Sequence, residues 1–216
     1  MFEVPVKLRT GKYAILLRAL SDGDSLDELT AMLQRAFSRL RQMGLNCTCI
    51  DQSVAVTRER IEKGACYVAV CDGRLVGTIT LYGPDLGSES AWYHRQAVAS
   101  IHQLGVDPEF QDRGLGTELL RLAEDWAREH GYQELALETP EPATHLVAFY
   151  VGHGYRPVES VGFQGKRYRS VVLSKRLAEQ NITNVLIRRP VFHIARRHPS
   201  PIRTPSAAQF GRITHI

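Results

Sequence analysis

One stretch, GVDPEFQDRGLGTELLRLAEDWA from Gly105 to Ala127, constrains the fold of this chain more than any other. An apolar run ends at Val106, a turn containing Pro108 follows, and two glycines one residue apart then precede a helical pattern. A strand that leads through a turn into a helix is a unit of sheets covered by helices. Apolar residues recur on one face of the expected helix: Leu115, Leu119, Leu122, Ala123 and Trp126.

The rest of the body also alternates between β-rich and helical patterns. Asp72-Gly73 stands between two β-rich runs and is a strong hairpin signal. The patterns predict strands at 13–20, on both sides of Asp72-Gly73, at 100–106, at 134–140 and twice within 156–177. They predict helices at 21–44, 56–64, 114–131 and 143–154. This order predicts an α/β (α+β) fold with a sheet of mixed direction.

Length and charge predict one domain with an appendage. The chain has 216 residues, is 44% hydrophobic and carries a net charge of +4. From Ala178 onward six arginines stand against one glutamate in a Pro- and Ser-rich segment, so the body itself is nearly neutral. We therefore expect a domain at 1–177 and a basic Arg/Pro-rich tail at 178–216. No uncharged run approaches the ~18 residues of a spanning helix, and we expect a cytoplasmic protein without membrane contact.

The four cysteines form no C-x-x-C pair, and buried free thiols are the expectation for a reducing compartment. We expect no metal.

The two glycines before the long helix suit an anion. A helix N-terminus exposes unpaired N–H groups, and glycine lets a ligand approach them without meeting a Cβ. Leu119 stands where a dinucleotide fingerprint needs its third glycine, and Thr117 stands where a nucleoside-triphosphate loop needs lysine. The pattern therefore indicates phosphate but leaves its source open.

The larger pattern Q-x-x-G-x-G, from Gln111 to Gly116, follows a strand that ends in VDP, and here the chain resembles the GNAT superfamily of acyl-CoA-dependent N-acyltransferases. The resemblance covers roughly Tyr13 to Leu177. It implies a mostly antiparallel sheet flanked by helices, acetyl-CoA as cosubstrate, and a strand that splays to accept the pantetheine arm. The residues it implies for coenzyme binding are Leu104, Gly105, Val106, Gln111, Asp112, Arg113, Gly114, Leu115, Gly116, Thr117 and Tyr150.

A second segment, ATHLVAFYVGHGYRPV, also matches the family. Tyr150 and the pair Gly154-Tyr155 fit its pattern, whereas Thr144 occupies a place that commonly holds asparagine. The resemblance implies that Tyr150 protonates the departing coenzyme A thiolate. The alternative is a half-buried helix aromatic packed beside Phe149.

Transfer to an amine also needs a base, because an amine is mostly protonated at neutral pH. Alternation along the strand puts Ser100, His102, Leu104 and Val106 on one face. Ser100 falls where histone-acetylating members place a glutamate, and it cannot serve as that base. We expect His102 to be the base, with Glu138 as the second candidate.

The acyl acceptor would bind next to the proposed base. The resemblance implies entry beside two segments that contain Asp51, Glu89, Trp92, Tyr93 and His94. Of these, Asp51, Trp92, Tyr93 and His94 are the predicted substrate-binding residues, because acidic and aromatic side chains can receive a cationic amine. We expect direct acetyl transfer to a small-molecule or peptide amine, and a possible homodimer. A non-catalytic coenzyme A sensor, or a nucleic-acid-associated module that uses the tail, is the alternative.

Overall fold

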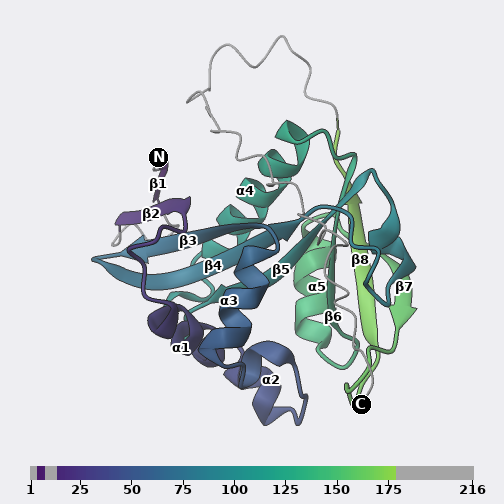
Figure 1. Cartoon of the computed structure of the whole chain (residues 1–216), viewed down its shortest axis with the longest axis horizontal. Coiled ribbons are helices and arrows are strands. Elements are labelled where there is room, and N and C mark those ends of the chain that lie inside the picture. The colour runs from purple at the N-terminus through teal and green to yellow at the C-terminus, as the bar shows by residue number, and fades with distance from the viewer. Residues whose placement is uncertain (1–3, 8–13, 179–216) are drawn as a thin grey trace, which may run out of the picture. The chain divides into compact units, whose positions relative to one another are not determined.

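The computed structural model describes residues 4–7 and 14–178 (Figure 1). Eight strands form one sheet in the order β1-β2-β3-β4-β5-β6-β8-β7. The strands are β1 Val4–Lys7, β2 Ala14–Ala19, β3 Ala65–Cys71, β4 Arg74–Tyr82, β5 Val98–Val106, β6 Glu134–Pro140, β7 Arg156–Val161 and β8 Ser170–Arg176. The helices are α1 Leu26–Ala36, α2 Ser38–Gln42, α3 Val54–Glu62, α4 Leu115–Glu129 and α5 Thr144–Gly152, with short 3-10 helices η1 Thr48–Ile50, η2 Ala91–His94 and η3 Pro108–Phe110.

Every neighbouring pair of strands is antiparallel except β5 and β6, which run parallel. The chain crosses from β5 to β6 through α4, as a parallel pair requires. The predicted fold class, a mixed and mostly antiparallel sheet flanked by helices, is confirmed. Strand β1 was not predicted, because its four residues are too few to show a period.

Helices cover both faces of the sheet. Alternation along β3 sends Val68 and Val70 to a cluster with α1, and Ala69 and Cys71 to a cluster with α4. Figure 1 shows α1 and α3 in front of the strands and α4 behind them. The ends of β5 and β6 therefore lie between two helical layers.

The long helix expected at 21–44 is wrong in one respect, because the chain forms two shorter helices that meet at Phe37. Phe37 packs over β5, where a Cβ added at Gly105 would lie 3.4 Å from its ring. The predicted Asp72-Gly73 hairpin is confirmed, since both residues have positive φ, 48° and 80°.

The described part of the chain ends at residue 178, so the predicted tail lies almost wholly outside it. No helix within 14–178 is long and apolar enough to cross a membrane.

Candidate active site

The parallel strands β5 and β6 separate part-way along their length. Their pairing ends at Ile101 of β5 and Leu137 of β6, although β5 continues to Val106 and β6 to Pro140. Beyond this point, the β5 main chain that faces β6 is not used in a ladder between the two strands. The gap gives an extended ligand a strand edge with which to pair.

A β-bulge in β5 lies at the start of this gap. Gln103 has φ +50°, and Gln103 and Leu104 together stand opposite the single residue Ile79 of β4. A bulge of this kind reverses the side-chain alternation for the rest of the strand.

The bulge corrects one prediction. Leu104 and Val106 pack against the cluster that contains α4, whereas Ser100 and His102 lie on the face toward α3. These four side chains therefore do not share one face, because simple alternation assumes an unbroken ladder.

The glycine turn, residues 111–116, follows β5 and opens α4. Gly114 is the N-cap residue with φ +93°, a left-handed conformation that suits glycine. The first bond within the helix runs from the Glu118 N–H to the Gly114 carbonyl. The N–H groups of Leu115, Gly116 and Thr117 therefore have no acceptor within the helix and stand at the positive end of its dipole. This arrangement can hold a diphosphate.

Side-chain contacts hold the segment before the turn. Gln111 Nε2 donates to the Val106 carbonyl at 2.9 Å. The Asp107 carboxylate pairs with Arg35 of α1 at 2.7 Å and accepts from the Glu109 N–H at 3.2 Å. The chain between β5 and α4 is thus tied to both β5 and α1.

Thr117 and His153 connect the start of α4 to the end of α5. His153 Nδ1 lies 2.7 Å from the Phe149 carbonyl, so in the neutral ring Nδ1 carries the proton. Nε2 then accepts from Thr117 Oγ1 at 2.9 Å. A Cβ added at Gly116 would lie 3.4 Å from the Phe149 ring. The turn therefore packs against α5 with little room for a larger side chain.

One cavity of about 650 Å³ joins the glycine turn to the gap between β5 and β6. Its volume falls within the ~300–1,000 Å³ that is usual for small-ligand sites. Most of the predicted coenzyme and catalytic residues line it: Leu104, Gly105, Val106, Gln111, Asp112, Gly114, Gly116, Thr117, His102, Glu138 and Tyr150.

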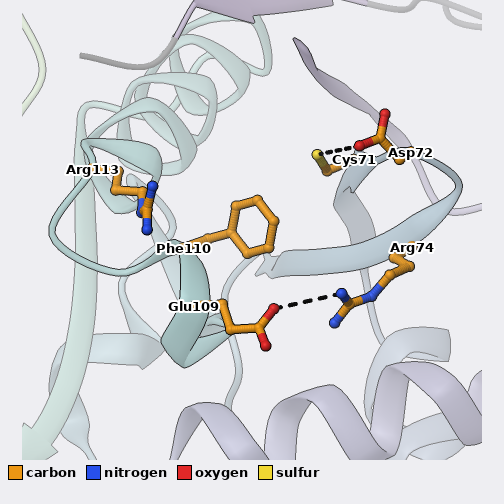
Figure 2. A pocket seen from close by; sticks show the side chains of 6 residues that line it. All are labelled: Cys71, Asp72, Arg74, Glu109, Phe110 and Arg113. Carbon is orange, nitrogen blue, oxygen red and sulfur yellow. Dashed lines mark hydrogen bonds and ion pairs between the residues drawn. The ribbon is translucent and has the colours of Figure 1, made fainter. Parts of the chain in front are cut away.

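Two residues of the predicted coenzyme set, Arg113 and Leu115, do not line this cavity. The Leu115 side chain is buried in the core. The Arg113 side chain borders a separate hollow of about 380 Å³ between η3 and the turn from β3 to β4, together with Phe110 and the ion pair of Arg74 with Glu109 at 3.5 Å (Figure 2). For Arg113 and Leu115, only the main chain fits the predicted role.

Tyr150 projects from α5 into the core beside the gap. Its side chain is buried, and its ring meets Phe149 edge to face at 5.2 Å between centroids. Burial raises the pKa of its hydroxyl well above the ordinary value. Tyr150 therefore keeps its proton at neutral pH and can donate it.

Glu138 lies on β6, just past the end of the pairing with β5. Its side chain lines the cavity and is exposed there. The cavity walls nevertheless reduce its hydration, and this desolvation raises its pKa to about 7. The positive charges of Arg60 and Lys166 act in the opposite direction and do not cancel the effect. A carboxyl group that titrates near neutral pH suits a general base.

His102 has a different environment. Its ring stacks on Tyr82 at 4.0 Å between centroids, and Nε2 lies 2.9 Å from Ser100 Oγ. Burial, helped by the charges of Arg60 and Lys63, lowers its pKa to about 3. A group with so low a pKa is a weak proton acceptor at neutral pH, and this favours Glu138, the second candidate, over His102 as a base.

The four predicted substrate-binding residues lie outside the cavity lining: Asp51, Trp92, Tyr93 and His94. Trp92 lies under the Arg95 guanidinium at 4.2 Å, and buried Tyr93 meets His102 at 6.0 Å. His94 Nε2 lies 2.8 Å from the Ser88 carbonyl. The segment that holds these three residues thus packs locally, and Tyr93 contacts His102. Asp51 follows η1 and is exposed.

Two cavity residues that we did not predict, Lys166 and Tyr168, come from the loop between β7 and β8. Lys166 Nζ donates to Thr48 Oγ1 at 2.9 Å, and the Asn46 side chain contacts the Gly165 carbonyl at 2.7 Å. The loops at 45–50 and 163–168 thus clasp each other over the cavity. No local pattern could reveal this contact, because more than a hundred residues separate the two loops.

The model of the acetyltransferase (GNAT) family matches residues 30–155. This chain belongs to the GNAT family. It is an acyl-CoA-dependent acetyltransferase. The S-(2-succino)cysteine N-acetyltransferase of Bacillus subtilis is 31% identical over 160 residues, which are 72% of this chain and 91% of that protein. The mycothiol acetyltransferase of Sanguibacter keddieii is 30% identical over 141 residues, 65% of this chain and 43% of that protein.

Solved structures show the same GNAT fold. A protein of Pyrococcus horikoshii superposes with a TM-score of 0.60 at 22% identity, over 75% of this chain and 98% of its own. A GNAT family acetyltransferase of Elizabethkingia anophelis with acetyl-CoA bound gives a TM-score of 0.55 at 19% identity, over 76% and 98% of the two chains.

Within the described residues of this GNAT enzyme, no three His, Cys, Asp or Glu side chains gather in a way that could hold a metal ion. The cysteines are free thiols: Cys47, Cys49, Cys66 and Cys71. Cys47 and Cys49 line the cavity.

Proposed function

We propose that this enzyme moves an acetyl group from acetyl-CoA directly to a primary amine. One observation carries the proposal: a single cavity is lined both by the N-terminus of α4, whose first N–H groups have no acceptor within the helix, and by a carboxyl group with a pKa of about 7. Buried Tyr150 lines the same cavity.

The coenzyme end fits a diphosphate and an extended arm. The main-chain N–H groups of Leu115, Gly116 and Thr117 would hold the pyrophosphate. The β5 main chain at Leu104 and Val106 would pair with the pantetheine amides along the gap left by β6. Bound acetyl-CoA supplies an activated acyl carbonyl to the cavity.

The protein's own part is the handling of protons. Ionised Glu138 would accept a proton from the acceptor ammonium, directly or through one water molecule, so that a neutral amine can attack. The Tyr150 hydroxyl, kept protonated by burial, would supply a proton to the leaving sulfur.

The cavity cysteines argue for direct transfer rather than a covalent acyl-enzyme. Burial raises the pKa of both the Cys47 and the Cys49 thiol above the ordinary value. A nucleophilic cysteine needs a lowered pKa to form its thiolate. Neither thiol therefore has the environment of a nucleophile.

An acceptor screen tests the proposal. Purified protein would be mixed with acetyl-CoA and single amines from a broad panel, and free thiol release would be followed over time. We expect at least one primary amine to accelerate release well above background hydrolysis, with mass spectrometry locating one added acetyl group on its nitrogen. A folded protein that binds coenzyme A but whose thiol release no amine accelerates would support the coenzyme A sensor instead.

A further inference from the structure

Among the described residues, three cationic side chains line the cavity without a carboxylate within 4.0 Å: Arg39, which is exposed, and Arg60 and Lys166, which are half-buried. The two half-buried cations carry the inference. Arg60 Nη1 contacts Cys49 Sγ at 3.3 Å and Gln52 Oε1 at 2.9 Å. Lys166 Nζ contacts the Asn46 carbonyl at 3.0 Å and Thr48 Oγ1 at 2.9 Å. All four contacts are neutral groups, since burial also raises the pKa of the Cys49 thiol.

Other cations at partly buried positions do have carboxylate partners. Arg18 pairs with Asp24 at 2.6 Å, and Lys175 pairs with Glu124 at 2.7 Å. Within residues 14–178, no carboxylate oxygen lies within 4.0 Å of the Arg60 or Lys166 nitrogens. Both side chains are only partly exposed, so they have lost part of their hydration without an ion pair to replace it.

These cations lie around the proposed base and away from the glycine turn. Both charges act on Glu138, and the charge of Arg60 also acts on His102. The Arg60 carbonyl accepts a bond of 2.6 Å from the hydroxyl of Tyr82, the ring on which His102 stacks. His102 precedes the end of β5 by four residues, a separation on the order of 10 Å along the strand. The coenzyme phosphates at the glycine turn therefore do not account for these cations.

The charges decide what kind of amine can enter. An ammonium group alone would meet two cations and one carboxyl that is only partly ionised at neutral pH. An acceptor that carries a carboxylate beside its amine would neutralise the cations and place its amine at Glu138. Acceptors that carry only amino groups, such as spermidine, are therefore disfavoured.

We propose that the acceptor is an amino acid, whose carboxylate binds Arg60 and Lys166 while its amine faces Glu138. The inference rests on the proposed N-acetyl transfer and adds the substrate class. Because there are two cations, the site can bind a second carboxylate beside the first. We therefore expect dicarboxylic amino acids to be the preferred acceptors within this class.

Paired acceptors test the inference separately from the activity. Thiol release would be measured with L-glutamate, L-methionine, L-methioninamide and spermidine, over a range of concentrations of each. We expect kcat/KM to be at least tenfold higher for L-methionine than for its amide, and higher again for L-glutamate. Equal values for acid and amide, or a preference for the amide or spermidine, would overturn the inference and leave the acetyltransferase activity standing. If none of the four compounds accelerates thiol release, amino acids are not the acceptor class.

Charge-removing variants locate the carboxylate site. At pH 8.5, where Glu138 stays largely ionised, Arg60→Gln and Lys166→Met should each raise the KM of the best acid acceptor tenfold or more, while the KM of acetyl-CoA and the rate with L-methioninamide change much less. Arg58→Gln and Lys166→Arg are the matched controls, since Arg58 is exposed outside the cavity lining and arginine keeps the charge. Lys166 also contacts the loop at 46–48, so Lys166→Met could disturb folding. In that case Arg60→Gln alone tests whether the cations bind the acceptor carboxylate. Equal losses with acid and amide would show that the cations only support the structure.

Discussion

Replacing Glu138 tests the proton acceptor most directly. Glu138→Gln keeps the size of the side chain and its place in the cavity but cannot accept a proton from an ammonium group. General bases contribute typically ~10²–10⁴-fold, so we expect kcat to fall by at least about a hundredfold. Coenzyme A affinity should stay the same, because the N–H groups proposed to hold the pyrophosphate belong to the start of α4.

The pH profile gives this prediction its magnitude. With a pKa of about 7, roughly one-tenth of Glu138 is ionised at pH 6 and roughly nine-tenths at pH 8. Because only the ionised form of Glu138 can accept a proton, kcat should follow the ionised fraction. It should therefore increase about tenfold from pH 6 to pH 8. A Glu138 at its ordinary value of 4.5 would be almost fully ionised over the same interval and would give a flat profile.

The assay is kcat at saturating acceptor and acetyl-CoA, from pH 5.5 to 8.5. Glu141→Gln is the matched control, because Glu141 is exposed beside the end of β6 and outside the cavity lining. Arg60→Gln should shift the midpoint upward, because the guanidinium favours the Glu138 carboxylate. His102→Ala should leave the midpoint in place, since the pKa of His102 lies near 3. A Glu138→Gln enzyme that keeps the wild-type slope between pH 6 and 8 would refute the assignment.

Three further perturbations test other parts of the site. Gly116→Val should weaken coenzyme A binding tenfold or more, about 1.4 kcal/mol by calorimetry, because a branched side chain would press on Phe149 and block the turn; unchanged affinity in a folded variant would count against the phosphate site. Tyr150→Phe should lower kcat by roughly 10²-fold and leave the Kd of coenzyme A unchanged, and wild-type kcat would mean that the ring only packs. Asp107→Ala removes the partner of Arg35 and the cap of η3, and urea unfolding should show a loss of about 1–3 kcal/mol; an unchanged midpoint would mean that this anchor is redundant.

The sequence predicted those parts of the fold that depend on neighbours along the chain. The strand at 134–140, the helix after Gly114 and the turn at Asp72-Gly73 each follow from local periodicity and turn chemistry. The break at Phe37 carries no glycine or proline signal. It depends on packing against β5, which no local pattern records.

In the site too, features set by neighbours along the chain were predictable and features set by tertiary packing were not. The glycine turn was visible as a motif, because a turn that enters a helix through a left-handed residue favours glycine at a fixed position. The pKa shifts of Glu138 and His102 were not predictable, because both depend on how far the folded protein removes water from around each group. The bulge at Gln103 changed which side chains of β5 share a face. Lys166 enters the cavity only through contacts with Asn46 and Thr48 far away in the sequence.

The clasp between the loops at 45–50 and 163–168 has a consequence for how this enzyme can diversify. β5 and the start of α4 line the part of the cavity proposed for the coenzyme, whereas these two loops line another part of it. Asn46 contacts the main chain of both Gly165 and Arg167, and Lys166 contacts the main chain of Asn46 in return. Exchanging one loop alone would leave polar groups of the other loop without their hydrogen-bond partners. A change of acceptor preference by design should therefore exchange the two loops as a pair. The residues of β5 and α4 that we propose for coenzyme binding can stay unchanged.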